Sequence, residues 1–175
     1  MKWPVLMLLT LSWVIPVQSQ SRGIKSYYDA ADHETHVETR NTAATNVKGT
    51  TVLTFQAWYY FKGRRQSPSK PPVLTVALTF KRELERFDDP DTDIAVNFLV
   101  DDKREGPYTA LRKGHKNFAE IYFFEDNRAD EILEKIAKGS KVQGEFETKK
   151  GKIEFELSPE TISQFKELYE RLHKN

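Results

Sequence analysis

The residues whose types could most readily bind a metal or catalyse a reaction are the acids and histidines of DHETH, from Asp32 to His36. A zinc-protease motif places two histidines four residues apart on a helix, with a glutamate beside the first. Here the histidines are three residues apart and adjoin a strand-like segment, in which residues i and i+3 face opposite sides. A zinc site would also need a distant third ligand, such as His115. We therefore interpret His33 and His36 as ordinary exposed histidines and expect no metal centre.

A second acidic run, FDDPDTD, places Asp89, Asp91 and Asp93 at alternate positions, as at the start of a calcium-binding loop. The later positions of such a loop require glycine at the sixth residue and glutamate at the twelfth. This chain has Ile94 and Val100 there. The run is more typical of a solvated turn than of a calcium site.

Four carboxylates form the third candidate, an acidic patch on the outward face of a hairpin predicted over residues 141–148 and 152–157. Its members are Glu145, Glu147, Glu154 and Glu156. Like charges directly across a sheet repel, and neighbouring lysines such as Lys152 can neutralise them. Otherwise the patch would meet a cationic partner or a metal ion. An exposed hairpin does not supply the cleft that separates the pKa values of a catalytic acid–base pair.

Common catalytic signatures are absent from the sequence. The chain contains no cysteine, no Gly-X-Ser-X-Gly elbow and neither the Walker nor the dinucleotide-binding glycine pattern. We therefore expect no catalytic residue and no cofactor, and favour a protein that is not an enzyme. The enzymatic alternative is a hydrolase with a dispersed site built from His33, His36, His115 or the acidic patch.

Aromatic residues crowd FQAWYYF, from Phe55 to Phe61. In an extended strand the odd-numbered side chains form an almost wholly apolar face, and the even face carries Gln56, Trp58 and Tyr60. We favour a central strand covered on both faces, because large exposed apolar patches are uncommon on monomers. If the even face is open, Gln56, Trp58 and Tyr60 are the best binding residues, since such rings are enriched in binding hot spots.

These residues need a scaffold, and the sequence predicts one dominated by strands with a period of two. The predicted strands cover residues 35–40, 50–61, 73–82, 94–100, 108–113, 118–124, 141–148 and 152–157. One helix is expected over 128–138; it carries an apolar stripe and ends at Gly139. Another begins with Ser158 as its cap and Pro159 at its first position. We predict a mainly β fold, with α+β as the alternative: an antiparallel β-sandwich-like domain of about eight strands, one internal helix and one C-terminal helix. The sequence does not separate this arrangement from its alternative, a single sheet covered by helices.

The amino terminus has the pattern of a secretory signal peptide, with Lys2, an apolar run from Val5 to Ile15 and small residues near Ser19. We predict residues 1–19 as the signal peptide, 20–33 as a flexible lead-in and 34–175 as a single β-rich domain. The chain has 27 basic and 26 acidic residues, and loss of Lys2 makes them equal. A neutral chain gives no counterion-release drive toward nucleic acid.

We therefore expect a secreted or periplasmic protein that binds an unknown protein or cell-envelope component, with no nucleic-acid partner and no membrane span after cleavage. A small-molecule carrier, with its ligand between sheet and helix, is a further alternative.

Overall fold

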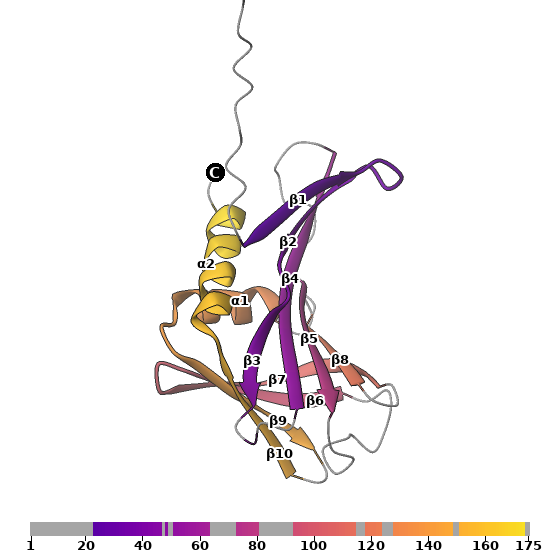
Figure 1. Ribbon diagram of the computed structural model, residues 1–175. Coiled ribbons are helices and arrows are strands. Elements are labelled where there is room, and N and C mark those ends of the chain that lie inside the picture. Colours follow the sequence, from indigo (N-terminus) through magenta and orange to yellow (C-terminus); the bar gives the residue numbers. More distant parts are fainter. Residues whose placement is uncertain are drawn as a thin grey trace, which may run out of the picture.

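The computed structural model describes residues 23–46, 48, 51–63, 73–80, 93–114, 118–123, 128–148 and 151–173 (Figure 1). Ten strands and two helices lie in these ranges. They are β1 (Ile24–Asp29), β2 (Glu34–Thr39), β3 (Thr42–Asn46), β4 (Thr51–Lys62), β5 (Val73–Phe80), β6 (Asp93–Val100), β7 (Lys103–Gly114), β8 (Phe118–Phe123), α1 (Ala129–Lys138), β9 (Val142–Thr148), β10 (Gly151–Leu157) and α2 (Pro159–His173).

Eight of the strands close into an antiparallel barrel. Its order is β4-β3-β10-β9-β6-β7-β8-β5, and β5 pairs back onto β4 over Thr51–Trp58. Closure gives every strand of the barrel two neighbours, which removes the unpaired edges of an open sheet.

The long strand β4 belongs to two parts of the molecule. Its first residues pair with β3, and its last five, Trp58–Lys62, pair with β2. The β1–β2 hairpin thus continues the sheet beyond the barrel; we call β1, β2 and the end of β4 the extension. It is the indigo hairpin that projects from the barrel in Figure 1.

Alternation along the strands separates a filled interior from the outer surface. The odd-numbered residues of β4 are buried, and its even-numbered residues are half-buried or exposed. Aromatic rings pack in the interior: Phe155 lies 4.9 Å from Phe146, 5.2 Å from Phe55 and 5.9 Å from Phe98 between ring centroids. Such burial of large rings is the main stabilising contribution to a domain of this size.

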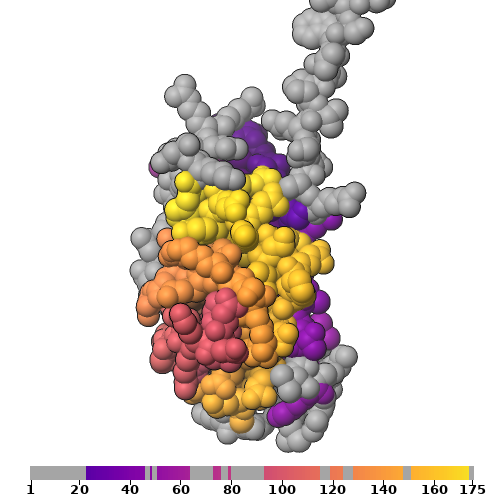
Figure 2. All heavy atoms as spheres, turned by 90° about the vertical axis from the view of Figure 1, so that its left-hand side faces the viewer, coloured from indigo at the N-terminus to yellow at the C-terminus, as the bar shows by residue number. Residues whose placement is uncertain are grey.

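The two helices cover the buried interior near the junction of the barrel and the extension. In Figure 1 α1 lies across one end of the barrel and α2 stands beside the extension. On the face seen in Figure 2, α2 lies above α1, with the β6–β7 hairpin below. The hydroxyl of Ser158 accepts the N–H of Thr161 (3.1 Å), so the predicted cap is present. Within the described residues, neither helix is long and apolar enough to cross a bilayer.

The prediction of a mainly β, antiparallel domain with two helices is confirmed, but the sandwich-like arrangement is not observed. The sheet closes on itself, because β5 pairs back onto β4 and because β3, early in the chain, pairs with β10 near its end. Two strands were missed: β3, and β1, which lies in the segment predicted as a lead-in. The predicted signal peptide, Asp89, Asp91 and His115 lie outside the described residues.

Candidate functional site

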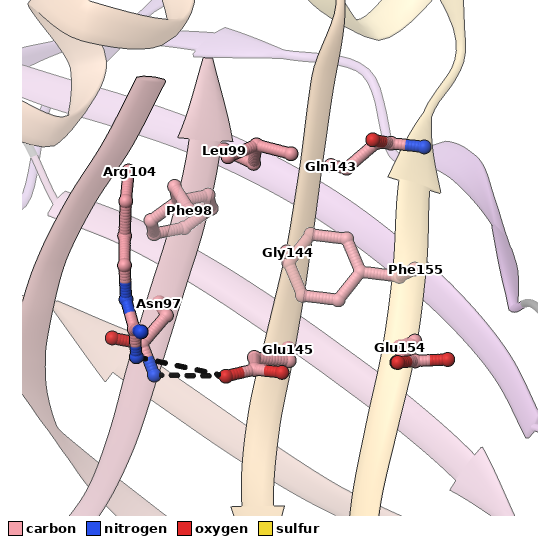
Figure 3. Close-up of a pocket in the computed structure, with 9 residues that line it drawn as sticks. All are labelled: Asn97, Phe98, Leu99, Arg104, Gln143, Gly144, Glu145, Glu154 and Phe155. Carbon is pink, nitrogen blue, oxygen red and sulfur yellow. Dashed lines mark hydrogen bonds and ion pairs between the residues drawn. The ribbon is translucent and has the colours of Figure 1, made fainter. Parts of the chain in front are cut away.

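A groove of about 390 Å³ crosses the outer face of β6, β9 and β10. Its side chains come from three strands and from the start of β7 (Figure 3). The lining residues are Asn97, Phe98, Leu99, Arg104, Gln143, Gly144, Glu145, Glu154 and Phe155. Phe98 and Phe155 are buried, so the side chains that reach solvent in the groove are mainly polar.

Gly144 sets the close approach between β9 and the interior beneath it. A Cβ atom at this position would lie 2.4 Å from Cζ of Phe155 and 2.8 Å from the carbonyl oxygen of Asn97. Real Cβ atoms do not make such contacts, so the strand accepts only glycine without a shift of ring or backbone.

Asn97 anchors one wall of the groove. Its side chain is 4% exposed, and Nδ2 donates to Oε1 of Glu145 (3.2 Å) and Oε1 of Glu147 (3.3 Å). Two carboxylates accept from this amide, so its nitrogen must face them and its oxygen must face away. The Oδ1 atom is buried and has no hydrogen-bond partner among the described atoms. Leaving a buried acceptor unpaired costs about 1–3 kcal/mol.

Glu145 is the carboxylate of the groove that contacts two basic side chains. Its Oε1 accepts from Nζ of Lys152 at 2.7 Å and lies 3.9 Å from Nη2 of Arg104. Only 21% of the Glu145 side chain is exposed, whereas Arg104 and Lys152 are 65% and 51% exposed. Ion pairs this open to water contribute at most about 1 kcal/mol each. Their effect is to hold Glu145 in place.

The acidic patch is present as a surface, with Glu154 directly opposite Glu145 in the β9–β10 register. Glu156 accepts from Nε2 of Gln143 (3.0 Å). Lys152, expected to neutralise the patch, contacts one of its four carboxylates, Glu145. Arg104 was missed, because Gly106 and Pro107 predict a strand that starts only at Tyr108, whereas β7 starts at Lys103. The sequence signal that could have indicated it is that Arg104 is a basic residue between the strands predicted over 94–100 and 108–113.

The aromatic strand places its candidate residues elsewhere, on the outer face of β4. The helices cover the opposite, odd face, and Trp58 and Tyr60 are half-buried. Gln56 already bonds within the chain: its Nε2 donates to the carbonyl oxygen of Thr39 (3.2 Å) and to Oε2 of Glu38 (3.4 Å). The structure therefore separates Gln56, Trp58 and Tyr60 from the acidic patch.

The histidines of DHETH do not meet at a metal site. His36 stacks on Tyr27 at 4.9 Å and contacts the edge of Tyr60 at 4.5 Å, whereas Nδ1 of His33 bonds to the Tyr28 hydroxyl (3.2 Å). Burial raises the pKa of Tyr27, and Glu38 and Asp29 raise it further, so this hydroxyl keeps its proton. Within the described ranges no group of three His, Asp or Glu residues is arranged to hold a metal ion.

The groove thus offers carboxylates, a guanidinium and amides for recognition through hydrogen bonds and charge. No family model, no curated protein and no solved structure matches this chain.

Proposed function

We propose that this chain is an exported, non-catalytic binding domain that recognises a protein or a cell-envelope component through the groove on β6, β9 and β10. The observation that carries the proposal is the groove itself, where polar side chains of four strands converge over a closed sheet. Concave sites with a few convergent polar groups are where proteins most often bind ligands.

The charges of the groove indicate the chemistry of the partner. Arg104 and Lys152 both contact Glu145, and the other carboxylates of the patch, Glu147, Glu154 and Glu156, lie beside it on β9 and β10. The excess of negative charge favours a partner that presents cationic or hydrogen-bond-donating groups. The signal peptide predicted from the sequence pattern of residues 1–19 is what supports a partner in the envelope or outside the cell.

The two alternatives have less support. A carrier with its ligand between sheet and helix would have to displace packed side chains, because Leu133 of α1 and Phe165 of α2 belong to the same buried cluster as Phe155 of β10. A hydrolase would need a base and an orienting group in contact, and His36 instead lies between two tyrosine rings.

Site-specific photocrosslinking tests the proposal. A photoreactive amino acid at Gln143, in the groove, is expected to give a discrete cross-linked product in cells that export the protein. The same amino acid at Thr109, exposed on β7 of the same barrel, is the matched control and is expected to give none. Charge reversal by Glu154→Lys should remove the Gln143 product.

Equal products from both positions, or none from Gln143, would contradict the groove as the binding surface. Mass spectrometry of the exported chain tests the other half of the proposal, because a start at Gln20 is expected. A chain that keeps residues 1–19 would overturn export by signal cleavage.

A further inference from the structure

The extension ends in a strand edge that the barrel does not have. β1 is last in the strand order and, within the described part of the chain, pairs only with β2. The N–H of Arg40 donates to the carbonyl oxygen of Gly23 (3.1 Å), which fixes the alternation of this antiparallel pair. Lys25, Tyr27 and Asp29 therefore direct their backbone groups toward β2. Ile24, Ser26 and Tyr28 direct theirs to the outer edge.

We infer that a second copy of this chain covers the edge, with two β1 strands paired antiparallel about a two-fold axis at Tyr27. In this register Ser26 of one copy exchanges backbone hydrogen bonds with Tyr28 of the other. Because this interface is isologous, one dimer uses both edges and the assembly stops there.

Charge complementarity selects this register. Only even-numbered residues of β1 direct their backbone groups outward. An even-numbered residue of one copy must therefore pair with an even-numbered residue of the other, whatever the register. Centring on Tyr27 places Lys25 opposite Asp29 of the second copy, twice. Centring on Lys25 would oppose two lysines, and centring on Ser26 or Tyr28 would leave Lys25 and Asp29 unmatched. Opposite charges across a strand pair are favourable and like charges are unfavourable.

The side chains at this edge fit that arrangement. Asp29 is held at the end of β1 by its own turn, since its Oδ1 accepts the N–H groups of Ala31 (2.8 Å) and Asp32 (3.4 Å). Lys25, Tyr27 and Asp29 share the outer face of β1; the Lys25 side chain is 60% exposed, and Tyr27 is 47% exposed. Lys25 has a long contact to Glu38 in its own chain (3.8 Å), which does not consume its charge. A lone lysine protects an edge against pairing, but here the second copy supplies its partner. The register also brings the two exposed Tyr27 rings together, where aromatic pairs stabilise adjoining strands.

The first experiment measures mass in solution by analytical ultracentrifugation of the processed chain. A dimer is expected, and Ser26→Pro should make the chain monomeric with an unchanged circular dichroism spectrum. Proline removes an N–H that points away from β2, so the β1–β2 hairpin keeps its own bonds. A monomer for the wild-type chain, or a dimer that survives Ser26→Pro, would overturn the inference.

Charge variants test the register itself. Lys25→Asp and Asp29→Lys should each weaken the dimer at least tenfold, because each one opposes like charges at both contacts. A mixture of the two variants should form a heterodimer, since each Asp then meets a Lys. Failure of the mixture to associate more tightly than either variant alone would contradict this register.

The absence of cysteine from the sequence allows a direct distance test. Tyr27→Cys should form a disulfide-linked dimer on mild oxidation, because the two copies of residue 27 form a non-hydrogen-bonded pair, whose Cα atoms lie about 4.5 Å apart, within the range that a disulfide spans. The control is Val52→Cys, on the outer face of β4 and 40% exposed. Equal cross-linking of both variants would indicate random collision and reject the two-fold axis at Tyr27.

Discussion

Two regions of the one sheet present different surfaces. The first is the part of the barrel formed by β6, β9 and β10, which we call the wall, and the second is the extension of β1, β2 and the end of β4. In the wall every strand has two neighbours, so only side chains can meet a partner, and they form the groove. In the extension, as far as the described residues go, the sheet stops at β1, which places backbone groups as well as side chains at its edge. Closure of a sheet therefore decides the kind of recognition that each region can perform.

The largest expected effect breaks the packing on which the wall depends. Phe155 is 1% exposed and contacts the rings of Phe55, Phe98 and Phe146. Phe155→Ala should lower the free energy of unfolding by about 3–5 kcal/mol, because it removes buried surface and leaves a cavity. Urea unfolding measures this change.

The extension supplies the contrast for that measurement. Tyr27→Ala removes a ring of comparable size that is 47% exposed, and the expected change is within about 0.5 kcal/mol at protein concentrations where the chain is monomeric. Similar losses for both variants would mean that the rings of the wall do not form the stabilising centre of the molecule.

A smaller effect is expected at the junction of the two regions, where β2 ends and β3 begins. Thr39 is fully buried, and its Oγ1 accepts the N–H of Ala57 (3.0 Å) at the point where β4 changes its partner strand. Thr39→Val keeps the shape but leaves that N–H unpaired, at a cost of about 1–3 kcal/mol. Amide hydrogen exchange should become faster in β2 and the end of β4, with no change in β9.

The exposed Thr45, in β3, provides the control, since Thr45→Val removes a hydroxyl from the surface. Faster exchange in β9 as well as in β2 would show that the wall and the extension open together, and that the junction does not separate them.

Local patterns in the sequence predict the parts of the fold that depend on neighbouring residues. Alternation predicts which side chains of β4 and β10 are buried, and Ser158 predicts the start of α2. β3 was missed because TAATN carries only small and polar residues, and β1 because its apolar residues do not alternate over a long enough run. Barrel closure depends on pairings such as β10 with β3, which no local pattern encodes.

The candidate site was predictable in part for the same reason. The outward position of Glu145 and Glu154 follows from the period of the hairpin. The groove also needs Asn97 from β6, which pairs with β9, and Arg104 from β7, which pairs with β6. The carboxylates that accept hydrogen bonds from Asn97 belong to residues 48 and 50 positions further along the chain.

The smallest expected effect depends on pH and concerns the turn that ties the wall to α1. Asp101 and Asp102 both have positive φ angles, 48° and 66°, in the β6–β7 turn, a conformation that Asn also adopts readily. The carboxylate of Asp101 accepts from the hydroxyl of Ser140 (2.7 Å) and from the N–H groups of Ser140 (3.0 Å) and Lys141 (2.9 Å). The side-chain bond from Ser140, followed by the two backbone bonds, holds the pKa of Asp101 below its ordinary value of 3.8.

A lowered folded-state pKa means that the ionised carboxylate stabilises the fold above pH 3.8, and that this stabilisation is lost as the pH falls through the lower folded value. Asp101→Asn should therefore lower the thermal midpoint at pH 7, and the difference from the wild type should shrink below pH 4. Asp102→Asn is the matched control, because that side chain is 83% exposed and lies 3.9 Å from Lys141. A difference for Asp101→Asn that stays constant from pH 7 to pH 3 would show that the turn is held by shape, and that charge does not distinguish this end of the wall from the extension.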